Sequence, residues 1–132
     1  KTKIIFDSLR LDFNNELVVV EGVFDMIKCG PNTACLLGSS LRSDHELFQK
    51  IVKNQTPVIL GLDSDMLSKS YSIAKDLTSY GVQVKILNLG SYHDIGSMSS
   101  EIVRQKCLEA PIYSRNNRLQ HLIGTINSGS IF

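Results

Sequence analysis

The sequence predicts an α/β fold built on a mostly parallel sheet of about four strands flanked by helices. Continuous runs of Val, Ile and Leu recur along the chain, and such runs are typical of strands buried on both faces of a parallel sheet. Stretches with apolar residues at helical spacing lie between these runs. This alternation of strand and helix indicates a parallel sheet with right-handed crossovers.

The first half of the chain is predicted to contain two strands and two helices. Residues 17–20 form the first strand, and the helix at 23–29 ends at a Gly-Pro pair, which stops a helix. Residues 33–37 form the second strand. The next helix is expected to begin with a capping box, in which Ser43 and Glu46 satisfy each other's free backbone donors.

The second half repeats this pattern. Residues 58–62 form the third strand, and residues 69–80 form a helix that a glycine ends. The fourth strand is expected at 82–87, where apolar residues alternate. A serine N-cap then begins a helix over 99–110, which the following proline ends.

We expect one central domain with a short extension at each end. The length of 132 residues suits a single domain. The domain is placed at 16–100, after a connector or edge strand in 1–15 and before a helical extension and tail in 101–132. Residues 3–6 are the candidate edge strand, and residues 116–123 a candidate short helix. The chain does not begin with Met, so we expect it to be a fragment of a longer protein.

Composition and charge argue against several classes of protein. Hydrophobic residues make up 42% and charged residues 20% of the chain, which is ordinary for a globular protein. No apolar run suits a membrane span, and the N-terminus lacks the features of a signal peptide. A net charge of +1 argues against an autonomous nucleic-acid binder. Three cysteines without a C-x₂-C pair indicate a reducing interior rather than a disulfide framework or a zinc site.

Two acidic segments follow two of the predicted strands. Glu21 and Asp25 come after the first strand, and Asp63 and Asp65 come after the third. Each pattern alone is common, because acidic residues after strands also serve turns and helix caps. Parallel strands bring their carboxyl ends to one edge of the sheet, where α/β proteins bind ligands. Together the two segments predict an oxygen-rich pocket suited to Mg²⁺ and phosphates.

The order and spacing of these motifs resemble the Toprim domain. This Rossmann-like domain is shared by bacterial-type primases, type IA and type II topoisomerases, and several nucleases and recombination proteins. The resemblance rests on E-G-V-F-D at 21–25 and D-S-D at 63–65. Three further features are similar to primases, including those of bacteriophages: G-S-S-L at 38–41, Lys69 after the D-S-D segment, and H-D-I-G-S-M at 93–98.

The resemblance implies a role for each residue that matches a motif. Three acids would act in catalysis: Glu21, Asp63 and Asp65. Five acids would bind metal: Glu21, Asp63, Asp65, Asp94 and Asp25, although Asp25 is equally a candidate for fixing the turn. Three residues would bind substrate phosphates: Lys69, Gly22 and Gly38. The implied cofactor is Mg²⁺, with Mn²⁺ as an alternative.

The function that the resemblance implies is primer synthesis. The chain would be the Toprim catalytic domain of a DNA primase, a Mg²⁺-dependent nucleotidyltransferase that makes RNA primers from NTPs on single-stranded DNA during replication. We expect it in the cytoplasm of a bacterial or phage-infected cell, away from membranes, with a replicative helicase as a further candidate partner. Two alternatives stay open: a Toprim-family nuclease or topoisomerase-like enzyme, and a non-catalytic Toprim protein that binds DNA or a partner.

Two positions depart from the primase pattern. Gly96 stands where primases commonly carry a second acid, two residues after Asp94. Met66 and Leu67 stand where small residues are usual. The departure at Gly96 predicts a metal site that has fewer carboxylates or relies on Asp25 and water. The larger residues at 66 and 67 argue against a close approach of substrate to the start of the next helix. The histidines show no metal-ligand spacing, and His93 is interpreted as a loop residue rather than a catalytic base.

Overall fold

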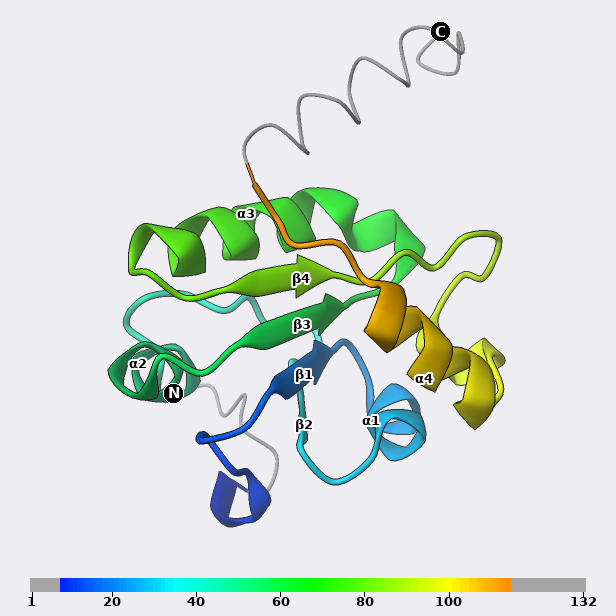
Figure 1. Cartoon of the computed structure of the whole chain (residues 1–132), viewed down its shortest axis with the longest axis horizontal. Coiled ribbons are helices and arrows are strands. Elements are labelled where there is room, and N and C mark those ends of the chain that lie inside the picture. The colour runs from blue at the N-terminus through cyan, green and yellow to red at the C-terminus, as the bar shows by residue number, and fades with distance from the viewer. Residues whose placement is uncertain (1–7, 115–132) are drawn as a thin grey trace, which may run out of the picture.

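The computed structural model describes residues 8–114, which contain a four-stranded sheet with helices on both faces (Figure 1). The strands are β1 (Leu17–Val20), β2 (Thr33–Cys35), β3 (Val58–Gly61) and β4 (Val84–Ile86). Their order in the sheet is β2-β1-β3-β4, and each neighbouring pair is parallel. The predicted fold class is therefore confirmed. The predicted domain boundaries at 16 and 100 stay a prediction.

The described helices alternate with the strands, as the sequence predicts. They are α1 (Val23–Cys29), α2 (Glu46–Asn54), α3 (Leu67–Ser79) and α4 (Ser100–Glu109). Short 3₁₀ turns occur at η1 (Ser8–Arg10), η2 (Ser64–Met66) and η3 (Ile95–Ser97). No helix within residues 8–114 is both long and apolar enough to cross a membrane. The predicted strand at 3–6 and helix at 116–123 lie outside the described residues.

The alternation of side chains along β1 divides the core into two layers. Leu17 and Val19 belong to a buried cluster that includes the apolar faces of α2 and α3. Val20 belongs to a second cluster, which includes Met26 of α1 and Val103 of α4. Helices α1 and α4 lie side by side on this second face (Figure 1). Each face of the sheet is therefore covered, which explains why the strands read as continuous apolar runs.

The start of α2 differs from the prediction, and the expected capping box is wrong. The helix begins at Glu46 with His45 at its N-cap. A turn precedes it, in which the backbone N–H of His45 donates to the carbonyl of Arg42 (2.9 Å). The backbone N–H of Arg42 in turn donates to Nδ1 of His45 (3.1 Å). Ser43 lies inside this turn, so its hydroxyl is out of register with the first free N–H groups of the helix.

The segment after α4 returns to the sheet and runs antiparallel beside β4, which the sequence did not indicate. The backbone N–H of Tyr113 donates to the carbonyl of Val84 (2.7 Å). The backbone N–H of Ile86 donates to the carbonyl of Pro111 (3.2 Å). These bonds add a short partner to the outer side of β4.

The direction of strand addition reverses between β1 and β3. The chain first places β2 on one side of β1, then crosses to β3 on the other side and continues to β4. At the carboxyl ends of the central pair, Val20 lies opposite Gly61. Open α/β sheets bind ligands at such a switch point, just beyond the strand ends. The two acidic segments leave the sheet at this point.

Candidate metal centre

Three segments of the chain bring four carboxylates to the carboxyl edge of the sheet. Glu21 and Asp25 follow β1, Asp63 follows β3, and Asp94 lies in the loop after β4. Burial raises the pKa of Asp63, and the negative charges of Asp25, Asp94 and Glu21 raise it further. These four acids from three separate segments therefore act on one another across a single site.

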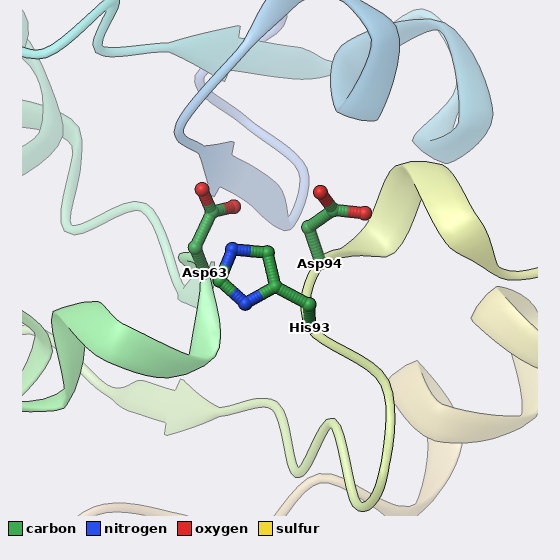
Figure 2. A group of neighbouring side chains, drawn as sticks. All are labelled: Asp63, His93 and Asp94. Atoms are coloured by element: carbon green, nitrogen blue, oxygen red, sulfur yellow. The ribbon is translucent and has the colours of Figure 1, made fainter.

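Asp63 and Asp94 come together with a residue that the sequence did not indicate. Asp63, His93 and Asp94 each offer one possible ligand atom, and these atoms all lie within 4.8 Å of one another. Figure 2 shows the three side chains pointing into the same space, between the loop after β3 and the loop that leads to η3. Two carboxylates and an imidazole are ligands that divalent metal ions accept in proteins.

One oxygen of Asp63 lacks a partner. Its Oδ1 atom is buried and makes no hydrogen bond within the described residues. Leaving a buried polar atom unpaired costs about 1–3 kcal/mol, and more when the group carries charge. A bound cation would supply the missing partner and neutralise the crowded carboxylates. The residues present therefore fit a divalent metal ion.

Asp94 is oriented by the turn that it begins. Its Oδ1 accepts hydrogen bonds from the backbone N–H of Ser97 (2.9 Å) and from the Ser97 hydroxyl (3.1 Å). Asp94 is thereby the N-cap of η3. These bonds fix the carboxylate before any ligand arrives, so little side-chain entropy is lost on binding.

Asp25 connects two loops and is only 7% exposed. Its Oδ2 accepts from the backbone N–H of Gly22 (3.2 Å), and its Oδ1 accepts from the backbone N–H of Gly96 (2.7 Å). Burial raises the pKa of Asp25, while these two hydrogen bonds lower it. Asp25 thus ties the start of α1 to the loop that carries Asp94. Its contacts favour the turn-fixing role over the metal-binding role.

The glycine that replaces a second acid is part of this connection. A Cβ atom at Gly96 would lie 3.1 Å from Oδ1 of Asp25 and 3.5 Å from Oδ1 of Asp94. A side chain here would therefore crowd the carboxylate of Asp25, and it would be in ordinary contact with that of Asp94. The absence of a side chain lets the backbone N–H of Gly96 approach Asp25, so a main-chain donor occupies the place where an acid was expected.

Glu21 is neutralised by a lysine within the protein. Nζ of Lys69 lies 3.2 Å and 3.3 Å from the two carboxylate oxygens of Glu21. The side chains of Lys69 and Glu21 are only 18% and 13% exposed, so water screens the pair weakly. The backbone N–H of Gly38 also donates to Oε2 of Glu21 (2.9 Å). Lys69 and Gly38, both predicted to bind substrate phosphates, therefore contact Glu21.

A close contact beneath the site joins two of its loops. A Cβ atom at Gly61 would lie 2.6 Å from Cδ1 of Ile95, which is far inside van der Waals contact. Gly61 ends β3 two residues before Asp63, and Ile95 directly follows Asp94. The missing side chain at Gly61 therefore allows the two loops to bring their carboxylates together.

Asp65 does not join this group. It is exposed in the first turn of η2, and its charge is not among those that shift the pKa of Asp25 or Asp63. His93 does join, although its spacing from other possible ligands gave no indication. The signal that was available is its position next to Asp94 in the loop after a strand.

A cavity of about 630 Å³ opens beside Asp63. It lies between α3 and the ends of β3 and β4, and the loop at 87–90 forms another wall. Its lining is mostly apolar, with hydrogen-bonding groups on Ser64, Ser70 and Asn88. Apolar walls with a few polar groups, and a volume in this range, are typical of small-molecule sites.

Comparison with known proteins identifies a similar fold. No family model and no curated protein sequence matches this chain. Among solved structures, a crystal structure of the Aquifex aeolicus primase that contains its zinc-binding and RNA polymerase domains is similar, with a TM-score of 0.63 and 20% sequence identity. The match covers 74% of this chain and 26% of that chain. The likeness is one of fold, between the α/β domain of this chain and part of that primase chain.

Proposed function

We propose that this chain is the cation-binding catalytic unit of a DNA primase, which joins NTPs into short RNA primers on single-stranded DNA. The observation that carries the proposal is the buried, unpartnered Oδ1 of Asp63 beside Asp94. This arrangement lies at the switch point of a sheet whose fold is similar to that of a primase. The chemistry requires such a site, because the phosphates of an NTP carry charge that must be neutralised during transfer.

A divalent ion at this site would neutralise those phosphates and align the attacking hydroxyl. The protein's own residues prepare the site in three ways. Ser97 orients Asp94, and Asp25 holds the loop through Gly96. Lys69 provides a point charge that can turn from Glu21 to an incoming phosphate, as expected for a lysine on a flexible stem.

The cavity beside Asp63 suits the remainder of a nucleotide. A nucleotide whose phosphates lie at Asp63 would have its nucleoside within reach of this cavity, because Asp63 and Ser64 form part of the lining. The apolar walls suit the faces of a base, and the polar groups of Ser70 and Asn88 suit its edge or the ribose hydroxyls. A nucleoside triphosphate is thus a substrate of suitable size and chemistry.

The test is incorporation of labelled NTPs on a single-stranded template by the full-length protein that contains this chain. We expect Asp63→Asn to lower the rate by about a hundredfold or more, because it removes a carboxylate that would hold the divalent ion at the reacting phosphates. Asp76→Asn is the matched control: it makes the same change at an exposed acid of α3, outside the group, and should retain activity. Equal losses in both variants would contradict this assignment of the site.

A non-catalytic role in binding DNA or a partner is the second candidate, because Glu21 is already neutralised by Lys69. Under that role, the wild-type protein would bind a divalent cation without incorporating nucleotides. Strand cleavage without synthesis in the same assay would instead support the nuclease alternative.

A further inference from the structure

The third member of the metal group is a histidine, which matters for the identity of the ion. His93 is exposed, and its possible ligand atom lies within 4.8 Å of those of Asp63 and Asp94 (Figure 2). Mg²⁺ is a hard ion that takes oxygen ligands, whereas imidazole is a common ligand of first-row transition metals. A nitrogen donor among the carboxylates therefore changes which ion the group prefers.

Two contacts connect Ser64 with His93, one to the imidazole ring and one to the backbone. The Ser64 hydroxyl lies 3.2 Å from Nδ1 of His93, and the backbone N–H of Ser64 donates to the carbonyl of His93 (2.8 Å). A metal-bound histidine usually makes a hydrogen bond through its other ring nitrogen, which fixes the tautomer and the ring orientation. With Nδ1 facing Ser64, Nε2 is the nitrogen left to bind an ion. In Figure 2, one ring nitrogen is turned toward the carboxylate of Asp63.

We propose that Asp63, His93 and Asp94 form a mixed nitrogen and oxygen site that prefers a divalent transition metal ion, with Mn²⁺ as the probe, over Mg²⁺. Ser64 is the positioning residue for His93. The proposal rests on the proposed function, because it assumes that a cation binds between Asp63 and Asp94. The unpartnered Oδ1 of Asp63 and the pre-oriented Asp94 supply the charge, and His93 supplies the selectivity.

The experiment measures Mn²⁺ binding to the full chain by electron paramagnetic resonance, and Mg²⁺ binding by its competition with Mn²⁺. We expect His93→Asn to weaken Mn²⁺ binding about tenfold or more and to leave Mg²⁺ binding nearly unchanged. Spin-echo spectra of bound Mn²⁺ should show modulation from a directly bound imidazole nitrogen in the wild type, and none in His93→Asn. Ser64→Ala should weaken Mn²⁺ binding by a smaller factor and keep the nitrogen signal.

The matched control is His45→Asn, which changes the other histidine of the described residues, at the N-cap of α2. It should alter neither ion's binding. His93 is exposed, so metal-free melting of His93→Asn should match the wild type and separate loss of a ligand from loss of the fold.

Two results would overturn the histidine ligand and leave the cation site intact. One is Mn²⁺ binding by the wild type without nitrogen modulation. The other is an equal loss of Mn²⁺ and Mg²⁺ affinity in His93→Asn. Absence of binding of either ion to the wild type would overturn the site itself, and the proposed function with it.

Discussion

The two acids that follow the central strands have opposite surroundings. Glu21, after β1, faces Lys69 at 3.2 Å and 3.3 Å and accepts a hydrogen bond from Gly38. Asp63, after β3, has a buried oxygen that accepts no hydrogen bond from the part of the chain that the structure describes, and its pKa is raised by burial and by neighbouring carboxylates. In the sequence both are simply acids at the ends of apolar strands.

The two carboxylates at this edge of the sheet therefore differ in how readily they bind a cation. A carboxylate paired with a lysine is satisfied in the absence of metal, whereas a buried unpaired carboxylate destabilises the fold until a cation arrives. We therefore expect the first cation to bind on the Asp63 side. Glu21 can bind one only after Lys69 has moved away, for example to a substrate phosphate.

The largest expected effect is on stabilisation by metal, when the charge of the unpaired Asp63 is removed. At a metal concentration of one hundred times Kd, ligand binding stabilises a protein by about 2.7 kcal/mol. The wild type should gain this stabilisation, and Asp63→Asn should gain almost none. Without metal, Asp63→Asn should be more stable than the wild type, because the charged form of Asp63 is disfavoured by burial and by its neighbours.

Thermal melting with and without Mn²⁺ measures both parts of this prediction, with Asp76→Asn, at an exposed acid of α3, as the control. A metal-free Asp63→Asn protein less stable than the wild type would show that Asp63 is satisfied by contacts within the fold.

The second prediction tests the contact that brings the two loops together. Gly61→Ala should cost about 1–3 kcal/mol and weaken metal binding, because the new Cβ overlaps Cδ1 of Ile95. Ile95→Val removes that atom, so the double variant should recover much of both losses. Urea denaturation of the two single variants and the double variant measures the coupling. Additive losses would mean that this contact does not set the loop position.

The third prediction concerns the ion pair between Glu21 and Lys69. Lys69→Met should lower stability by about 1–3 kcal/mol, because Glu21 is left as a largely buried charge without its cation. The loss should be smaller in a Glu21→Gln background, where no charge is stranded. Metal affinity on the Asp63 side should be retained, which calorimetric titration can measure. Loss of metal binding in Lys69→Met would show that the two sides work as one site.

The smallest effect is a dependence on pH. Asp25 and Asp63 both have pKa values raised above the ordinary 3.8, so the folded protein binds their protons more tightly than the unfolded chain does. Without metal, their contribution to stability is present at low pH and is lost as pH rises from about 3.8 through the raised values. In Asp63→Asn, the part of this pH-dependent loss of stability that Asp63 causes is absent.

The stability advantage of Asp63→Asn should therefore widen with increasing pH across that window. Urea midpoints measured with EDTA present over a series of acidic to neutral buffers would show it. A constant difference would mean that Asp63 titrates normally.

Much of the fold could be predicted because burial leaves a direct mark on the sequence. The runs at 17–20 and 58–62 are apolar throughout because both faces of the sheet are covered. The start of α2 could not be predicted from Ser43, because a turn closed by the His45 side chain competes with the capping box. Local patterns do not reveal which of two short-range arrangements the tertiary structure stabilises.

The sequence could predict which segments meet at the site, but not which side chains contact one another there. Motif order placed Glu21, Asp63 and Asp94 at one edge, but it treated Asp65 as equivalent to Asp63. Their difference depends on the turn at η2, which leaves Asp65 exposed. The Glu21 to Lys69 pair and the inclusion of His93 depend on side-chain directions that spacing along the chain does not encode.

The short antiparallel partner of β4 has a consequence for association between molecules. An outer strand with free N–H and C=O groups is a template for strands of other chains. The bonds from Tyr113 to Val84 and from Ile86 to Pro111 occupy part of that template. A variant truncated after residue 110 would keep the described helices and strands yet expose the outer side of β4, and sheets of neighbouring molecules would then be free to join edge to edge.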